Sequence, residues 1–348
     1  MIRFVIVIAA VALAGANRCV AQENVSGSSA VVFPGDRWQR ADPQALGMRA
    51  GPLRLARDYA LTAGGAGIIV RHGKVVMSWG DLQRKFDLKS TSKSIGVTAF
   101  GLAIDDGRMK LDDLASNHHP SLGVPPESNR QTGWIETITL RHLATQSAGF
   151  DKPGGYTSLL FEPGTRWHYS DGGPNWLAEC VTLAMDRDIE SLMVDRILNP
   201  IGISKEDLHW RKHQYRDANI GEHRRCEFGS GVHANVDAMA RIGLLYLRKG
   251  QWSDRQLLSE RFVESVARPD RSLAGLKEWS DDHGDASQHY GLLWWNNGDG
   301  TLAGVPRDAF WSWGLYDSLI VVITSLDLVV SRAGRSWKRG SGENHYDV

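Results

Sequence analysis

Strand-like sequence occurs near both ends of this chain, and the stretch between them is helical. Residues 67–79 form two β-branched runs around a His-Gly turn, as in a β-hairpin, and a helix is expected to begin near Ser90. Helical periodicity dominates residues 137–200. Strands first, helices in the middle and strands last is the pattern of an α+β fold: an antiparallel sheet flanked by helices, with an all-helical insertion lobe. After the insertion we expect a helix over 236–247 and strands over 290–295, 309–313, 319–324 and 328–331.

Length and charge exclude several classes of protein. The 348 residues include 40 basic and 40 acidic side chains, and 42% are apolar, as in a soluble globular protein of one large domain or two ordinary ones. The formal net charge of zero argues against a nucleic-acid partner, since nucleic-acid binders carry a basic excess. No Cys/His spacing typical of zinc occurs, so we expect no metal and no cofactor. The expected partner is a small molecule, and the sequence does not determine the oligomeric state.

Residues 1–21 have the pattern of a secretory signal peptide. A basic start at Arg3 precedes the apolar run 4–16, which is too short to span a bilayer, and a small-residue exit ends at Ala21. A membrane anchor and a lipoprotein are the alternatives. We therefore expect an exported protein, periplasmic or secreted, with no membrane span after signal removal. The rest of the chain divides into an extended lead-in over 22–48, the main domain over 49–338 and a polar tail over 339–348.

Three groups of reactive residues are expected to be structural. Export would permit a disulfide between Cys180 and Cys226, and their pairing stays open, although Cys180 lies in an apolar helical pattern typical of a buried thiol. The His118-His119 pair and the basic stretch 223–225 lie in loop-like sequence. We expect both to be solvated rather than to bind a ligand.

The sequence lacks the G-x-S-x-G, H-E-x-x-H, P-loop and G-x-G-x-x-G signatures, which argues against the usual α/β-hydrolases, zinc proteases, nucleoside-triphosphate hydrolases and dinucleotide enzymes. It has Ser90 and Lys93 in an S-x-x-K motif at the expected helix start. Side chains three apart project from nearly the same face of a helix, so Lys93 can take the proton that makes the Ser90 hydroxyl nucleophilic. The helix start also offers the Ser90 backbone N–H as half of an oxyanion hole. The alternative is that Ser90 is only an N-cap.

A second candidate element follows a tight turn at 162–164, where Tyr169-Ser170-Asp171 precedes an apolar helix. Tyr169 can share the proton of the nucleophile with the lysine and then pass it to a leaving group as general acid. The alternative is a loop tyrosine, with Ser170 or Asp171 capping the next helix.

Together these motifs resemble the serine β-lactamase/penicillin-recognising superfamily, specifically its class C-like branch. That branch contains carboxylesterases, D-amino-acid peptidases and 6-aminohexanoate-dimer hydrolase. The S-x-x-K motif at Ser90 and the Y-S-x motif at Tyr169 stand in the order typical of the family, and the likeness covers roughly residues 50–335. Further similar segments are 140–150, 161–164, 229–231 and 290–295.

The resemblance implies a third motif at Ser312-Trp313-Gly314, after which the backbone N–H of Leu315 would complete the oxyanion hole. β-Lactamases have a lysine at the position of Ser312. Loss of that cation removes a partner for a substrate carboxylate and favours neutral esters or amides. The residues implied to contact substrate are Trp313, Gly314, Ser170 and Asp171.

The C-terminal end departs from the family pattern. The family usually finishes with an apolar-faced helix packed on the sheet, and the polar sequence after Trp337 shows none. The chain is therefore expected to be truncated or to cover that face of the sheet otherwise, because an exposed apolar face would favour aggregation.

The predicted function is that of an exported serine hydrolase that cleaves a small ester or amide through an acyl-enzyme. In this hypothesis Ser90 attacks, Lys93 is the base, Tyr169 relays the proton, and water deacylates the enzyme. The alternative within the enzymes is a β-lactamase or a D-alanyl/D-amino-acid peptidase. The alternative outside them is a non-catalytic protein that binds cell-wall fragments.

The 13 tryptophans sharpen the hypothesis about the substrate. Trp167 and Trp176 flank the second motif. Trp311 and Trp313 lie along the expected third-motif strand, where alternate residues share one face, and Trp294 and Trp295 lie on the strand expected to be its neighbour. The sequence therefore predicts an aromatic-walled acyl pocket for an uncharged substrate.

Overall fold

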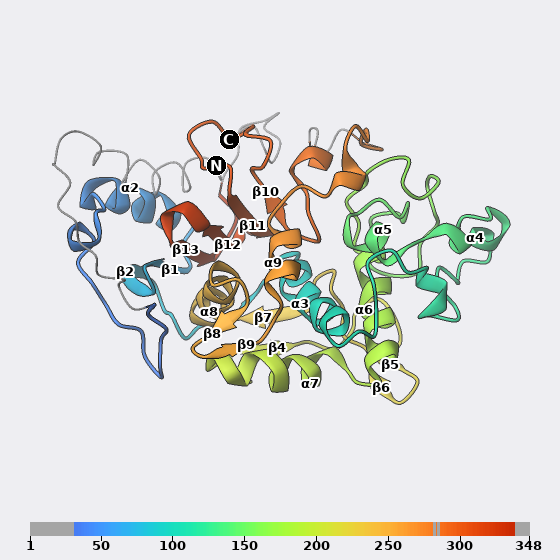
Figure 1. Ribbon diagram of the computed structural model, residues 1–348, viewed down its shortest axis with the longest axis horizontal. Helices are drawn as coiled ribbons and strands as arrows, with labels where there is room; N and C mark the ends of the chain where they lie inside the picture. Colours follow the sequence, from blue (N-terminus) through green and yellow to red (C-terminus); the bar gives the residue numbers. More distant parts are fainter. Residues whose placement is uncertain (1–30, 281–282, 284–285, 338–348) are drawn as a thin grey trace.

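The computed structural model describes residues 31–280, 283 and 286–337. A six-stranded antiparallel sheet, in the order β10-β11-β12-β13-β1-β2, forms one part of the molecule and a helical lobe lies beside it (Figure 1). This is the predicted α+β fold. The predicted signal peptide, residues 22–30 of the lead-in and the polar tail lie outside the described residues. The strands are β1 (Ala66–Arg71), β2 (Lys74–Trp79), β10 (Trp295–Asn296), β11 (Ala309–Gly314), β12 (Ser318–Ile323) and β13 (Leu328–Ala333).

Distant parts of the chain meet in the sheet because β1 pairs with β13, with Ala66 opposite Ala333. The predicted hairpin is confirmed, and its turn residues His72 and Gly73 have φ values of 51° and 73°, the left-handed pair that a two-residue hairpin requires. Strands β12 and β13 are buried along their whole length, which explains their continuous apolar runs. The expected strand over 290–295 is largely wrong, because only β10 at its end joins the sheet.

Helices α3 (Thr91–Asp105) and α8 (Val236–Leu247) pack on the inner face of the sheet. The helix predicted over 236–247 is therefore confirmed. Gly243 allows the close approach of α8, since a Cβ there would lie 2.6 Å from the side chain of Val329 in β13. Helix α3 is buried on all sides because β11 contacts it on one side and α6 (Gly172–Met185) on the other.

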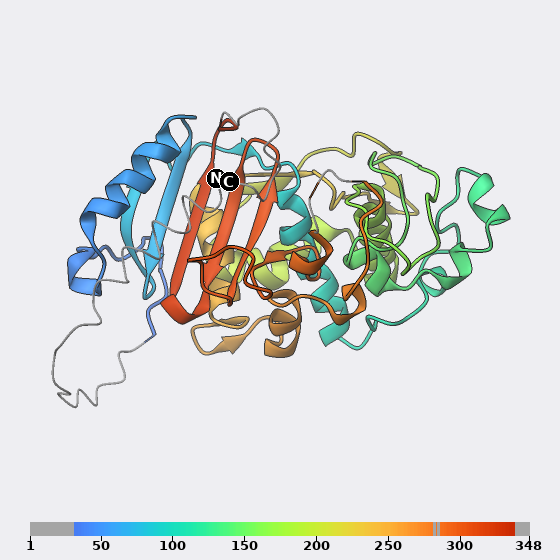
Figure 2. The same ribbon diagram turned by 90° about the horizontal axis from the view of Figure 1, so that it is seen from above.

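Helix α2 (Ala50–Leu61) and the loop 297–308 lie over the outer face of the sheet (Figure 2). Buried Asn297 fixes this loop, because its side-chain amide donates to two backbone carbonyls of the loop at 2.9 and 3.2 Å. After β13, Trp337 stacks on Tyr59 of α2 with ring centroids 5.4 Å apart. No helix follows β13 within the part of the chain that the structure describes, and these other segments cover the outer face.

The insertion lobe is built around α6, on which a short helix, α5, packs. It is less helical than predicted, because residues 145–171 contain neither a helix nor a strand apart from isolated bridges. The remaining helices are α4 (Ser128–Gln131), α5 (Leu140–Ala144), α7 (Ile189–Met193) and α9 (Glu260–Val266). The remaining strands are β3 (Phe86–Asp87), β4 (Leu208–Trp210), β5 (Asn219–Ile220), β6 (His223–Arg224), β7 (Val232–Ala234), β8 (Gln251–Trp252) and β9 (Arg255–Gln256).

A buried ion cluster surrounds Glu179 of α6. The carboxylate is 1% exposed and lies 2.6 Å from Arg216, 3.0 Å from Arg225 and 3.0 Å from His119. Burial raises the pKa of Glu179, but the hydrogen bond with His119 and the charges of the two arginines outweigh it and lower the pKa to about 2. The expectation that His119 and Arg225 are solvated is wrong, because Glu179 pairs with both inside the lobe.

Cys180 and Cys226 are both free and buried, so the predicted buried thiol at Cys180 is confirmed. Across residues 31–280, 283 and 286–337, no helix combines the length and apolarity needed to cross a bilayer. The same residues contain no group of three or more His, Cys, Asp or Glu side chains placed to hold a metal ion.

Glu179→Gln should lower the free energy of unfolding by about 3 kcal/mol at neutral pH, since the pKa falls from 4.5 to about 2 and each unit corresponds to about 1.4 kcal/mol. Because the folded-state pKa is depressed, the stabilisation is fully present above pH 4.5 and is lost as the pH falls toward 2. Urea unfolding between pH 7 and pH 3 measures both effects, with Glu206→Gln as the exposed control. Equal losses in the two variants would contradict the assignment.

Candidate active site

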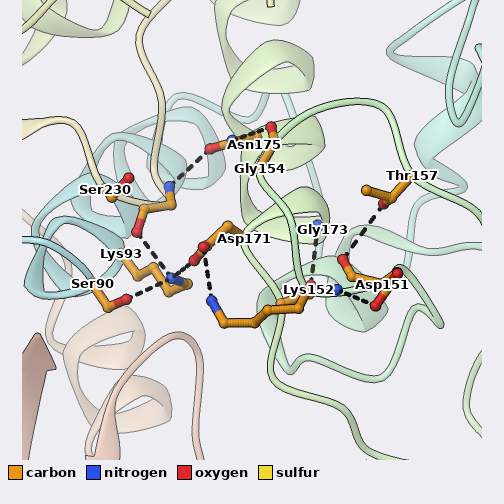
Figure 3. A network of polar contacts seen from close by, with 12 residues as sticks. Ser90, Lys93, Asp151, Lys152, Gly154, Thr157, Asp171, Gly173, Asn175 and Ser230 are labelled. Atoms are coloured by element: carbon orange, nitrogen blue, oxygen red, sulfur yellow. Dashed lines mark hydrogen bonds and ion pairs between the residues drawn. The ribbon is translucent and has the colours of Figure 1, made fainter. Parts of the chain in front are cut away.

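Ser90 stands immediately before α3, and its side chain contacts Lys93 one turn along (Figure 3). Lys93 Nζ donates to Ser90 Oγ at 3.1 Å and to the backbone carbonyl of Gly229 at 2.9 Å. The lysine is only 1% exposed. All of α3 is described, and the Ser90 hydroxyl makes no capping bond to it. The structure therefore places the two residues of the S-x-x-K motif in direct contact.

Asp171 joins this pair from the lobe. One of its carboxylate oxygens pairs with Lys93 Nζ, and the other accepts a hydrogen bond from Lys152 Nζ at 2.8 Å (Figure 3). Burial raises the pKa of Asp171, but the charges of both lysines outweigh it and hold the pKa below its usual value. Asp171, which the resemblance implies to contact substrate, lies between the Nζ atoms of two lysines and also lines the cavity described below, so a contact with substrate stays a prediction.

Tyr169 approaches Ser90 from the lobe side. Its phenol interacts with the Ser90 side chain, and its ring centre lies 4.7 Å from Lys93 Nζ and 5.3 Å from Lys152 Nζ. Burial raises the pKa of Tyr169, and the opposing effects of Lys152 and of the hydrogen bond with Ser90 are smaller. The phenol is therefore neutral at physiological pH, so it can exchange a proton only as part of a concerted relay.

Two buried amides hold the segments that carry these groups. Gln146 Oε1 accepts from both the N–H and the hydroxyl of Ser170, at 3.0 and 3.1 Å. Asn175 Oδ1 accepts the N–H of Gly229 at 2.8 Å, and its Nδ2 donates to the carbonyl of Gly154 at 2.8 Å. Ser170 is 3% exposed, so the expected contact between its hydroxyl and substrate does not fit the structure. The hydroxyl instead positions the second motif.

A cavity of about 350 Å³ opens beside Ser90. Tyr169, Trp295 and Trp313 form an aromatic wall, with ring centroids 5.6 Å apart for Tyr169–Trp295 and 6.0 Å for Trp295–Trp313. Trp311 was expected to share this wall but is fully buried. The cavity thus has an aromatic wall, to which Trp313 and Trp295 contribute as predicted and Trp311 does not.

The end of β11 comes very close to the start of α3 at Gly314. A Cβ on Gly314 would lie 2.1 Å from a backbone carbonyl of the turn before α3 and 3.0 Å from the amide nitrogen of Thr91. Only glycine therefore lets the strand bring Leu315 to the same cavity as Ser90. Ser312 lies fully buried, with its hydroxyl 3.3 Å from that of Thr91, so it presents no group to the cavity.

The turn that follows Leu315 is fixed by contacts that reach across the sheet. Arg332 of β13 donates to the carbonyls of Tyr316 and Asp317 at 2.7 and 3.0 Å. Asp317 accepts hydrogen bonds from the indole N–H of Trp313 at 3.1 Å and from the backbone N–H of Trp337 at 2.9 Å. The cavity wall is thus tied to the segment that follows β13.

Several residues of the site were not found from the sequence. Lys152, Lys89, His283 and Tyr215 all line the cavity, and Asn175 supports it from behind. Lys89 is next to Ser90 in the sequence, so its place at the site could have been inferred from that position. Lys152, by contrast, pairs with the carboxylate of Asp171, which lies 19 residues further along the chain across an irregular loop. No spacing rule connects such residues before the loop is folded.

The fold and the contact between Ser90 and Lys93 described above are both found in one class of protein, and comparison with known proteins assigns the chain to that class. The chain belongs to the β-lactamase family, whose model, described as Beta-lactamase, matches residues 54–340. Members of this fold family are serine hydrolases. A search of the curated proteins gave no match. The assignment to the class C-like branch stays a prediction.

Solved structures share the fold at low sequence identity. A putative β-lactamase from Bacteroides dorei is 15% identical with a TM-score of 0.67, over 84% of this chain and 92% of that one. A hydrolase with promiscuous acyltransferase activity is 16% identical with a TM-score of 0.61, over 87% and 95%. A putative 6-aminohexanoate-dimer hydrolase from Bacillus anthracis is 14% identical with a TM-score of 0.57, over 80% and 75%.

Gly314→Ala should slow labelling of Ser90 by a fluorophosphonate probe by about a hundredfold, because a displacement of about 1 Å at a reaction centre has this order of effect. The added methyl would collide with the backbone carbonyl of Leu88 at 2.1 Å as well as with the Ser318 side chain, and the backbone contact cannot be relieved by a change of rotamer. The measurement is the labelling rate by intact mass, with the melting temperature alongside. Gly51→Ala in α2 is the matched control, since a Cβ there meets nothing within 4 Å. Labelling at the wild-type rate in Gly314→Ala would refute the close approach.

Proposed function

We propose that this chain is an exported serine hydrolase that cleaves a small ester or amide through an acyl-enzyme at Ser90. The observation that carries the proposal is the double contact of the Ser90 hydroxyl, with Lys93 on one side and Tyr169 on the other, at the wall of an aromatic cavity. A serine hydroxyl becomes an effective nucleophile only when a positioned base takes its proton. Export is supported by the signal-peptide pattern of residues 1–21.

In the proposed acylation step, the amine form of Lys93 takes the proton of the Ser90 hydroxyl while Oγ attacks the substrate carbonyl carbon. The negative charge that develops on the carbonyl oxygen is stabilised by the backbone N–H groups of Ser90 and Leu315. The positive end of the α3 dipole contributes to the same stabilisation. Tyr169 then passes the proton to the departing alcohol or amine, and the bond between the carbonyl carbon and the leaving group breaks.

Deacylation uses the same groups in the reverse sense. A water molecule gives one proton to the Lys93/Tyr169 pair and attacks the acyl carbon, and Ser90 leaves with the proton returned to Oγ. Asp171 and Gly229 hold the lysine in position through both steps, since each contacts its Nζ. The aromatic wall would contact the apolar part of the acyl group or of the leaving group.

Ser90→Ala should abolish turnover of a short-chain p-nitrophenyl ester and the mass adduct with a fluorophosphonate probe, because it removes the hydroxyl that contacts Lys93 and forms the acyl-enzyme in the proposed mechanism. Intact mass spectrometry and a chromogenic assay measure the two effects. Ser121→Ala serves as the control and should keep the adduct, since Ser121 is exposed and is not part of the cavity lining. Full turnover in Ser90→Ala would disprove the nucleophile assignment.

The same assay separates the alternative functions. Hydrolysis of a chromogenic cephalosporin faster than the ester would favour a β-lactamase, and cleavage of D-alanyl peptides would favour a peptidase. Absence of any adduct with the wild-type protein would favour a non-catalytic binding protein.

Tyr169→Phe should reduce kcat by about a hundredfold or more, in the range found when a proton-transfer group is removed. The ring would stay stacked on Trp295, so the melting temperature should change little. The measurement is kcat for a p-nitrophenyl ester and for an anilide, because the two leaving groups differ in their need for a proton. A larger loss for the anilide is expected because the anilide nitrogen must be protonated as it leaves. Equal kcat values in variant and wild type would remove Tyr169 from the relay.

A further inference from the structure

Two lysines near Ser90 share one carboxylate. Lys93 and Lys152 both contact Asp171, one at each of its carboxylate oxygens. Lys93 is buried below the cavity, whereas the side chain of Lys152 is 49% exposed and lines the cavity. The Lys152 ammonium is therefore the lysine head group that a molecule bound in the cavity can reach.

The other charges at the cavity have their own partners. Lys89 Nζ lies 2.6 Å from the carboxylate of Asp87. The Asp317 carboxylate accepts two N–H groups and interacts electrostatically with Arg332. Among the residues that the structure describes, these two pairs therefore contribute little net charge to the cavity. Asp151, directly before Lys152 in the chain, is a further acidic neighbour.

Asp151 does not neutralise the Lys152 ammonium. Its carboxylate accepts the backbone N–H of Lys152 at 2.7 Å and lies 3.9 Å from His168. Figure 3 shows the Asp151 carboxylate on the opposite side of the Lys152 backbone from the ammonium group, which points toward Asp171. The Lys152 ammonium thus lies on the cavity side.

The backbone around Lys152 is held firmly, which is required of a residue that selects substrates. Its carbonyl accepts the N–H of Asp171 at 2.9 Å. Two residues further, the carbonyl of Gly154 accepts from Asn175, and that of Gly155 accepts from Arg216 at 2.9 Å. Arg216 belongs to the buried Glu179 cluster, so the lobe interior fixes the loop that carries the cation.

We propose that Lys152 is a specificity-determining residue that binds an anionic group, most simply a carboxylate, on the ester or amide substrate. The ammonium has three N–H donors and Asp171 takes one of them. The remaining donors face a cavity whose other wall is aromatic, so the site suits a substrate with an apolar body and one negative charge. The expectation of an uncharged substrate is thereby replaced. This inference rests on the proposed hydrolase function.

The test compares kcat/KM for matched pairs of esters that differ by one carboxylate. The acyl-side pair is p-nitrophenyl hydrogen glutarate against p-nitrophenyl pentanoate. The leaving-group pair is p-carboxyphenyl pentanoate against its methyl ester. In at least one pair, Lys152→Gln should lower the anionic-to-neutral ratio of kcat/KM by about tenfold, the effect expected when a charged hydrogen bond in a partly enclosed site is lost.

Lys152→Arg should keep the anionic-to-neutral ratio of kcat/KM because it retains the charge. Lys205→Gln is the control for overall charge: it removes an exposed lysine that is not part of this cavity, and it should leave the ratio unchanged. Raising the ionic strength should lower the ratio in the wild type, because salt screens the attraction between Lys152 and the substrate anion. It should not lower the ratio in Lys152→Gln, which lacks that charge. The ester pair whose ratio falls in Lys152→Gln shows whether the anionic group is bound on the acyl side or on the leaving-group side of the scissile bond.

An unchanged ratio in both pairs for Lys152→Gln would overturn the proposal, even if turnover of the neutral esters falls. Failure of the hydrolase function is seen separately, as Ser90→Ala keeping the turnover of all four esters. A ratio that falls equally in Lys205→Gln would point to the overall charge of the protein and would also overturn the role of Lys152.

Discussion

The ion pair between Lys93 and Asp171 links the two parts of the molecule at the place where the chemistry is proposed to occur. Lys93 comes from α3, below the sheet, and Asp171 from the residue before α6 in the lobe. Lys93 is almost fully buried, and separating the pair would leave a charge without its partner, at a cost of several kcal/mol. The arrangement of lobe and sheet, and therefore the shape of the cavity, depends on this contact.

A second constraint acts from the sheet. Gly314 lets the end of β11 approach α3, and Arg332 and Asp317 fix the turn that follows. Trp337 stacks on α2 and also donates to Asp317, so packing on the outer face of the sheet reaches the aromatic wall of the cavity. The site is thus assembled from the start of α3, a lobe loop and the end of a strand, each held by buried contacts of its own.

The sequence predicted the elements whose signal is local. The helix over 236–247 and the hairpin around His72 were found because periodicity and turn chemistry act over a few residues. The strand expected over 290–295 failed because its aromatic residues pack into the core and the cavity wall instead of forming a ladder. The solvated loops failed for a related reason, since the carboxylate that pairs with His119 and Arg225 lies on a helix far from either in sequence.

By itself, the sequence determined the fold class, the contact of Ser90 with Lys93 and the aromatic character of the pocket, because short spacings along one helix or strand fix which side chains meet. Only the tertiary structure decided which charged groups meet at the site. Lys152 reaches Asp171 across an irregular loop, and Asp171 reaches Lys93 over 78 residues, so this arrangement exists only once these segments are packed together. Electrostatic interaction depends on distance in space, which the order of residues does not specify.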